Sequence, residues 1–251
     1  MFVRFPQAEV DVGNTRIKWR VRYAMDRLGP VMYRSSADSA VVMGELQVDG
    51  VRALALSSVG APAAVQQWQQ YAQECQWSLY LAASESSAAG VVNAYREPGR
   101  LGVDRWLAMI AAHNAYPSDC LCVFNAGSAL TVDFVATNGR HLGGYIVQGW
   151  AMLQRALLGN TQRIHVRAEM MSDTLPGDDT DSCVGHGRLL MWQGFIRQMI
   201  VQAESYSAVP RFVVAGGDAD KVLPVLQGRL CMHCPDLVLD GLAIMARSAE
   251  C

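Results

Sequence analysis

The chain has 251 residues, 51% of them hydrophobic and 18% charged, and its formal net charge is −2. This length accommodates one large domain or two of about 100–150 residues, with enough apolar side chains for a well-filled core. The near-neutral net charge excludes a broad basic surface for nucleic-acid binding. The sequence has no apolar run of about 18 residues, so it predicts no membrane-spanning helix.

The first half of the chain alternates strands with helices, which predicts an α/β fold. Pro62 stands at the first position of one helical pattern, and Pro117 ends another. Pro6 and Glu9 interrupt the apolar pattern of the first strand, which we therefore expect to be short. The predicted elements are hairpin strands at 10–12 and 17–21, a buried strand at 51–59, and helices at 62–75 and 102–116.

The second half begins again with an apolar strand, a turn at 125–128 and a returning strand. The predicted strands are 121–124, 130–135, 143–147 and 211–215, and the predicted helices are 180–203 and 235–246. Because the two halves start alike, we expect two α/β domains, residues 1–117 and 118–251.

The seven cysteines are an odd number scattered along the chain, which is typical of reduced thiols in a cytosol. The segments 120–122 and 231–234 contain cysteine pairs that could assemble a zinc site, but free thiols explain the pattern more simply. The N-terminus has Arg4 and Pro6 and no apolar segment of the kind a signal peptide needs. We therefore expect a cytoplasmic protein that binds neither nucleic acid nor membrane.

The first hairpin has the composition of a phosphate-binding turn. Gly13 and Asn14 tolerate positive φ, which would let consecutive backbone N–H groups converge on one anion. Thr15 adds a hydroxyl, Lys18 a positive charge, and Asp11 a ligand for the cation that accompanies a nucleotide. The alternative is an ordinary hairpin turn, in which adjacent Asn and Gly are common. The segment reads Asp11, Val12, Gly13, Asn14, Thr15, Arg16, Ile17 and Lys18.

The pattern recurs in part at Asn125, Ala126, Gly127 and Ser128, again between two strands. Two such hairpins facing each other across a cleft could clamp a nucleotide between two domains. The chain has neither a P-loop motif nor a Gly-x-Gly-x-x-Gly motif, so the common nucleotide-binding alternatives lack support.

These motifs resemble the acetate and sugar kinase, actin and heat-shock chaperone ATPase superfamily. Within it, the chain resembles the type III pantothenate kinases over almost its whole length. The resemblance rests on an ordered set of motifs, at 11–15, 102–105, 143–146, Thr180 before Gly185, 216–217 and 235–242.

The resemblance implies two ribonuclease H-like, actin-like ATPase domains with a nucleotide cleft between them. It also implies ATP-dependent phosphorylation of pantothenate to 4'-phosphopantothenate, the first step of coenzyme A synthesis, with Mg²⁺ as cofactor. Similar enzymes are homodimers that bind substrate close to the subunit interface. The alternatives are a catalytically weakened homologue that serves as a nucleotide-binding regulatory protein, and a related kinase for another small alcohol.

The resemblance assigns a role to each motif residue. Asp104 would be the general base that accepts the proton of the pantothenate alcohol, and Arg105 would bind the substrate carboxylate. Without the other motifs, these two residues would read as an exposed ion pair at a helix start. Residues 11–18 and Ser128 would bind ATP. The substrate-binding set comprises Tyr95, Gly102, Val103, Asp104, Arg105 and Thr180.

The second hairpin departs from the family pattern, which is roughly Asp-x-Gly-Thr-Ala. Asn125 replaces the aspartate that similar enzymes use to bind an activating monovalent cation such as K⁺ or NH₄⁺. An amide offers a carbonyl oxygen but no charge, so cation affinity should fall or vanish. Ser128 keeps the hydroxyl of the usual threonine. Gln148 stands where a proline is usual, and Ala215 where a threonine often stands.

Overall fold

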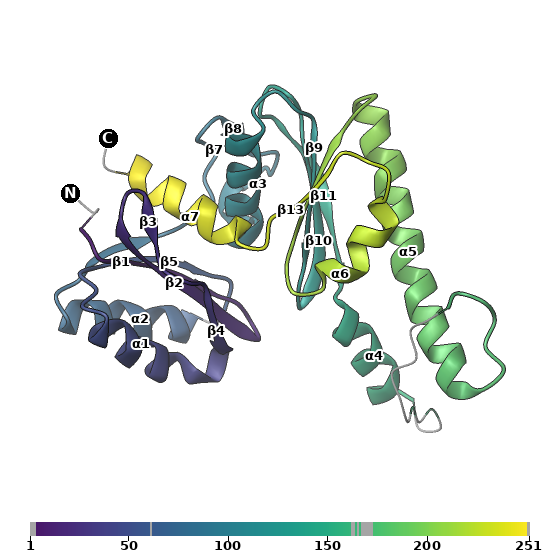
Figure 1. Cartoon of the computed structure of the whole chain (residues 1–251), viewed down its shortest axis with the longest axis horizontal. Coiled ribbons are helices and arrows are strands. Elements are labelled where there is room, and N and C mark those ends of the chain that lie inside the picture. The colour runs from purple at the N-terminus through teal and green to yellow at the C-terminus, as the bar shows by residue number, and fades with distance from the viewer. Residues whose placement is uncertain (1–3, 61, 162–163, 165, 167–172, 250–251) are drawn as a thin grey trace. The chain divides into compact units, whose positions relative to one another are not determined.

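The computed structural model describes residues 4–60, 62–161, 164, 166 and 173–249, and the chain divides into two compact units (Figure 1). Unit 1 comprises Met1–Ser118, Thr137–His141 and Asp236–Cys251, and unit 2 comprises Asp119–Ala136 and Leu142–Pro235. The C-terminal helix, which a division at residue 117 assigns to the second half, therefore belongs to unit 1. The physical reason is that its apolar face packs against the helix and the sheet of that unit.

Unit 1 is built on a mixed sheet with the strand order β3-β2-β1-β5-β6, and β4 also pairs with β2. β1 is antiparallel to β2 and parallel to β5, which is parallel to β6. A separate two-stranded ladder pairs β7 with β8. The strands are β1 (Gln7–Val12), β2 (Arg16–Ala24), β3 (Arg27–Leu28), β4 (Met32–Ser35), β5 (Ala53–Ser58), β6 (Ser78–Leu81), β7 (Ser87–Ala88) and β8 (Val91–Val92).

The two faces of the main sheet of unit 1 have different partners (Figure 1). One face is apolar, including Val10 and Trp19, and packs on α1 (Ser39–Val48) and α2 (Pro62–Glu74). The other face, which carries Glu9 and Asp11, meets α7 (Leu237–Ser248), and α7 packs on α3 (Val103–Ala115). Short 3₁₀ turns lie at Ser36–Asp38 and Pro98–Arg100.

Unit 2 repeats this sheet topology, with the order β11-β10-β9-β12-β13. β9 is antiparallel to β10 and parallel to β12, which is parallel to β13, so the three pairings match those of β1, β2, β5 and β6. The strands are β9 (Leu121–Ala126), β10 (Ala129–Val135), β11 (His141–Gln148), β12 (Arg211–Ala215) and β13 (Cys231–His233). The prediction of two α/β domains that start alike is confirmed at the level of topology.

The core of unit 2 lies between one face of its sheet and two helices, α4 (Trp150–Gly159) and α5 (Thr180–Tyr206). Apolar residues at alternating positions of β9 and β10 face this core, as do Trp192 and Ile196 of α5. A short helix α6 (Ala219–Val222) and a 3₁₀ turn (Leu223–Leu226) follow β12. Among the described residues, no helix combines the length and hydrophobicity that crossing a membrane requires.

The expected short first strand is wrong. β1 runs from Gln7, and Glu9 lies inside it with its side chain fully buried. Its carboxylate binds two arginines of β2, Arg20 at 2.5 Å and Arg22 at 2.6 Å. The register of the hairpin brings these charges together, because Glu9 pairs with Arg20 across the strands.

Candidate active site

Asp11 lies at the end of β1 on the face that meets α7, between two neighbouring strands. Across β2 its register partner is Lys18, and across β5 it is Ser57, whose hydroxyl donates to Asp11 Oδ1 at 3.0 Å. Burial is the main cause that raises the pKa of Asp11 from its ordinary value of 3.8 to about 7, and the charge of Asp104 adds to it. The Ser57 hydrogen bond and Lys18 act in the opposite direction. Asp11 and Asp104, which the sequence separates widely, therefore form one electrostatic site.

The turn after Asp11 differs from the predicted geometry. Neither Gly13 nor Asn14 has a positive φ, and the Gly13 N–H donates to the Arg16 carbonyl at 3.0 Å. That amide is thus used to close the turn, and a Cβ on Gly13 would come within 3.0 Å of the same carbonyl. Ser36 supports the turn through hydrogen bonds with Gly13 and Thr15. The prediction that positive φ angles at Gly13 and Asn14 gather backbone N–H groups around an anion is wrong. The hydrogen bond between Gly13 and Arg16 closes the turn without a positive φ at either residue.

The remaining residues of the predicted phosphate segment divide by exposure. Asn14, Thr15 and Arg16 are exposed at the tip of the hairpin, whereas the side chains of Val12 and Ile17 are buried in the core. The two buried residues can offer only backbone groups to a ligand.

Lys18 is held by an ion pair. Its Nζ lies 2.8 Å from Asp236 Oδ1, immediately before α7, and 5.4 Å from the ring centroid of Tyr33. The sequence predicts Lys18 as a phosphate ligand, and the structure adds a carboxylate that fixes where its ammonium stands.

Asp104 is the second residue of α3, and Gly102 is the N-cap. A Cβ on Gly102 would lie 2.7 Å from Asp104 Oδ1, so the glycine leaves the space that the carboxylate occupies. The positive end of the helix dipole favours the ionised form of a carboxylate at this position. Val103 is buried, which anchors this first turn to the core. Asp104 is thus a partly exposed carboxylate on a rigid element.

Arg105, the next residue, is buried and points to a different neighbour. Its Nη1 donates to the Tyr95 hydroxyl at 2.9 Å, and the Tyr95 ring stacks on His141 with centroids 6.2 Å apart. The Tyr95 loop is held by Asn93, whose Oδ1 accepts from the Tyr95 N–H at 2.9 Å. The structure therefore brings together Tyr95 and Arg105, the two residues that the resemblance assigns separately to the substrate. The contact between His141 and Tyr95 is one that no local sequence signal marks.

Unit 2 holds the second hairpin and its glycine neighbours. Asn125 is partly buried in β9, and its register partners are Thr131 and Ala215. The Gly127 N–H donates to the Ala129 carbonyl at 2.9 Å, which leaves Ser128 exposed at the tip of the turn. The backbones that pack here are close, because a Cβ on Gly149 would lie 2.2 Å from the Gly127 carbonyl oxygen.

The loop after β12 lies against the same strand. Gly216 has φ +94°, and a Cβ there would lie 2.2 Å from the Ala126 carbonyl oxygen. The Asp218 N–H donates to that carbonyl at 3.0 Å. Only glycine fits both the backbone conformation and the close approach.

Thr180, the last predicted substrate residue, is the first residue of α5 and is exposed. Asp179 precedes it and caps the helix by accepting from the Ser182 N–H at 2.7 Å. This cap explains why a helix begins here and presents the Thr180 hydroxyl to solvent.

Metal binding has limited support among the described residues. In the described part of the chain, no group of three or more His, Cys, Asp or Glu side chains could hold a metal ion. The cysteines considered for zinc therefore form no such group among these residues. Asp11 nevertheless offers hard oxygen ligands in a site with excess negative charge, since Asp104 lies near it. That chemistry fits the Mg²⁺ that accompanies a nucleotide, which would bring further ligands from its phosphates and from water.

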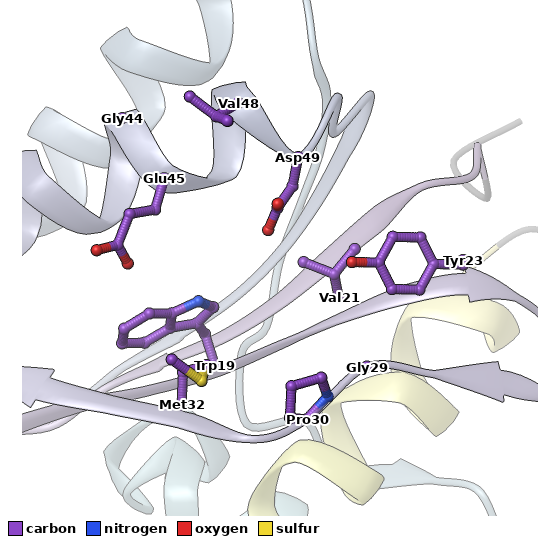
Figure 2. A pocket seen from close by; sticks show the side chains of 10 residues that line it. All are labelled: Trp19, Val21, Tyr23, Gly29, Pro30, Met32, Gly44, Glu45, Val48 and Asp49. Atoms are coloured by element: carbon purple, nitrogen blue, oxygen red, sulfur yellow. The ribbon is translucent and has the colours of Figure 1, made fainter.

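A separate cavity of 560 Å³ lies between α1 and β2 (Figure 2). Trp19, Val21 and Met32 line it, with Glu45 and Asp49 of the helix side at its rim. Because strand residues alternate, Trp19 faces this cavity and Lys18 faces α7 on the other side of the sheet. None of its lining residues is a predicted site residue.

Comparison with known proteins gives consistent matches. The family model of type III pantothenate kinase matches residues 9–202. A type III pantothenate kinase from Nitrosococcus oceani is 33% identical over 252 residues, covering 96% of this chain and 94% of that protein. The enzyme of the same name from Pseudomonas aeruginosa is 37% identical over 243 residues, with coverages of 94% and 97%.

Solved structures match over both units. A Baf family protein from Campylobacter jejuni has a TM-score of 0.58 at 15% identity, covering 96% of this chain and 98% of that one. Component A of (R)-2-hydroxyglutaryl-CoA dehydratase from Acidaminococcus fermentans has a TM-score of 0.52 at 12% identity, with both coverages 96%. At these identities the likeness concerns the fold alone, and it confirms the predicted class of two actin-like ATPase domains.

Proposed function

The chain belongs to the type III pantothenate kinase family, and from this membership we propose how its residues serve the reaction. The enzyme transfers the γ-phosphoryl group of ATP to pantothenate, using a divalent metal, in the first step of coenzyme A synthesis. The observation that carries this function is the family match over residues 9–202 together with close relatives along nearly the full length.

Asp104 is the general base. As the phosphoryl group moves, a bond forms between the pantothenate alcohol oxygen and the γ-phosphorus, and the bond from phosphorus to the β,γ-bridging oxygen of ATP breaks. The alcohol proton passes to the Asp104 carboxylate. This assignment is supported by the position of the partly exposed Asp104 carboxylate at the start of α3 and by its nearness to Asp11.

Asp11 and the hairpin that follows bind the nucleotide. Bound Mg²⁺ supplies charge neutralisation for the phosphates, and Asp11 is the residue that would hold it. Lys18 provides a positive charge close to Asp11, and the exposed Asn14 and Thr15 provide polar groups at the hairpin tip. In unit 2, Ser128 has the corresponding exposed place on its own hairpin.

Arg105 and Tyr95 bind pantothenate. Arg105 presents five N–H donors in a fixed plane, a geometry suited to the substrate carboxylate, and its bond to the Tyr95 hydroxyl holds that plane in place. Gly102 and Val103, at the start of α3, belong to the same substrate-binding segment, and Thr180 contributes its hydroxyl to substrate binding. Stacking on His141 supports Tyr95 from behind.

The monovalent cation site, the quaternary structure and the compartment complete the proposal. Asn125 offers K⁺ or NH₄⁺ only an uncharged carbonyl oxygen, so the affinity for a monovalent cation is low or lost. The enzyme is a cytoplasmic homodimer, the state that the resemblance to the family implies. Light scattering that gave a monomer mass at micromolar concentration would refute the dimer.

The decisive test is turnover by the purified protein with ATP, Mg²⁺ and pantothenate, with and without K⁺ or NH₄⁺. Asp104→Ala should lower kcat by about 10²–10⁴-fold, the range for loss of a general base, while calorimetry shows ATP binding largely kept. A small effect on kcat would remove Asp104 as the base. Nucleotide binding without turnover by the unaltered protein would favour a regulatory homologue instead.

A further inference from the structure

Two acidic residues at the start of α7 pair with two basic residues of β2. Lys18 Nζ lies 2.8 Å from Asp236 Oδ1, and Arg20 Nη1 lies 2.8 Å from Asp240 Oδ1. Four residues of helix rise by about 6 Å, and two residues of strand by about 6.7 Å, so the acidic and basic spacings match. The double pairing therefore fixes the position of α7 along β2. A shift by one helical residue would break both ion pairs.

On the strand side of this double ion pair, Arg20 is buried and paired with a second carboxylate. The Arg20 side chain is only 4% exposed, and its Nε binds the buried Glu9 carboxylate at 2.5 Å. Among the described residues, Arg20 Nη2 is buried and has no hydrogen-bond partner. A buried guanidinium with one donor unsatisfied depends strongly on the acceptors that remain, which are Glu9 and Asp240. The Asp240 side chain is 50% exposed, so it can be replaced without opening a core cavity.

The other side of α7 touches the catalytic helix directly. A Cβ on Gly241 would lie 2.0 Å from the Leu107 carbonyl oxygen and 2.9 Å from the Leu107 Cα. The two backbones are thus in contact, with no flexible side chain between them. Leu107 is one turn along α3 from Asp104. Any displacement of α7 is therefore passed to the residues that carry the base, because packed backbones cannot absorb it.

We propose that Asp240 is a positioning residue for phosphoryl transfer: by pairing with Arg20 it sets the place of α7, and through Gly241 and Leu107 the place of Asp104. The proposal rests on the role of Asp104 given above. The segment 235–242 belongs to the ordered set of sequence motifs, and this proposal gives that segment a role. The buried ion pair between Glu9 and Arg20 anchors Asp240 on the strand side.

The test compares Asp240→Ala, Asp240→Asn and Asp240→Glu in the full-length enzyme. The matched control is Glu45→Ala, which removes another helix-to-strand ion pair, with Arg34, from the opposite face of the sheet. We expect Asp240→Ala to lower kcat by about 10- to 100-fold, as a misplacement on the order of 1 Å can do, with KM for both substrates changed little. Asp240→Asn should lie between, Asp240→Glu should recover kcat to near the original value, and Glu45→Ala should leave kcat unchanged.

Hydrogen exchange at residues 103–107 provides a readout that does not need turnover. These amides should exchange faster in Asp240→Ala than in the unaltered protein or in Glu45→Ala. Gly241→Ala should have the same effect, and Gly44→Ala, whose Cβ would meet nothing within 4 Å, should not. If Gly241→Ala fails to fold, the Asp240 series decides.

Three outcomes overturn the proposal: unchanged kcat and exchange in Asp240→Ala, an equal loss of kcat in Glu45→Ala, or no recovery in Asp240→Glu. If the unaltered protein shows no pantothenate kinase activity but Asp240→Ala still loosens residues 103–107, the proposed function fails and the positioning role of the double ion pair stands. The two failures are therefore distinguishable.

Discussion

Replacing Asp11 with asparagine should stabilise the nucleotide-free protein at pH 8 while removing its activity. Asp11 is partly buried, and burial followed by the charge of Asp104 raises its pKa from 3.8 to about 7. A raised pKa means that the folded protein resists the ionised form of this carboxyl. Asp11, the residue proposed to hold the divalent cation, is therefore a source of instability when no cation is bound.

The sign and size follow from proton linkage. Between about pH 4 and pH 7, the folded protein holds a proton on Asp11 that the unfolded chain has released, so stability falls as the pH rises through this window and levels off above it. A shift of about three pKa units corresponds to roughly 4 kcal/mol. Solvent reaches part of Asp11 and screens its charge, so the measured loss should be smaller, on the order of 1–3 kcal/mol.

The assay is urea unfolding at pH 5, 6, 7 and 8, without nucleotide. The unaltered protein should lose stability along this series, and Asp11→Asn should lose less, so that the variant is the more stable of the two at pH 8. Asp49→Asn, which alters an exposed carboxyl of the same unit, is the control and should follow the unaltered protein. Adding Mg²⁺ with ATP should stabilise the unaltered protein and not Asp11→Asn. Identical pH dependence in both proteins, or a less stable Asp11→Asn at pH 8, would refute the reasoning.

Two other substitutions test separate features. Glu9→Gln should lower the free energy of unfolding, measured with urea, by about 3–5 kcal/mol. The reason is that Arg20 and Arg22 would remain buried without the carboxylate that they share. A loss under about 1 kcal/mol would mean that water already solvates the two arginines. Asn125→Asp should raise activity or its dependence on K⁺ in steady-state assays, and no change in either would mean that the carboxylate meets no cation there.

The sequence predicts several of the longer elements to within a residue or two of their observed ends. The helix predicted at 102–116 is observed as α3 (Val103–Ala115), and the strand at 211–215 as β12. Several missed elements are short or lack an amphipathic pattern, but the amphipathic ten-residue helix α4 (Trp150–Gly159) was missed as well. β3, β7 and β8 have two residues each, too few for any period, and α1 carries apolar residues around its surface without a side-chain cap.

Glu9 shows a deeper reason for failure. A charged residue in an apolar run reads as an interruption, but a strand with one face against a helix can bury a charge if the next strand supplies its partner. Here Arg20 and Arg22 lie on the same face of β2, two residues apart. Their alternation with Trp19 and Val21 was visible in the sequence. The pairing register, which joins them to Glu9, was not.

The residues of the candidate site also differ in how far the sequence could predict them. Asp104 and Arg105 are adjacent in one motif, but only the resemblance of the whole ordered motif set to a kinase family marks them as candidate site residues; by themselves they would suggest an exposed ion pair at a helix start. Tyr95 and His141 come from separate segments, and their stacking depends on tertiary structure. The φ values of the first turn were also beyond the sequence, because Gly13 is needed there for close approach to the Arg16 carbonyl and not for a left-handed conformation.

The two hairpins share a topology but place different chemistry at equivalent points. In unit 1, Asp11 has Lys18 on one neighbouring strand and Ser57 on the other, a cation and a donor that both favour its ionised form. In unit 2, Asn125 has Thr131 and Ala215, neither of which carries a charge. A carboxylate at 125 would therefore rely on a bound cation for compensation, whereas an amide is stable without one. The amide at residue 125 thus lets this hairpin fold without a monovalent cation, whereas the carboxylate at residue 11 has a cation and a hydrogen-bond donor on its neighbouring strands.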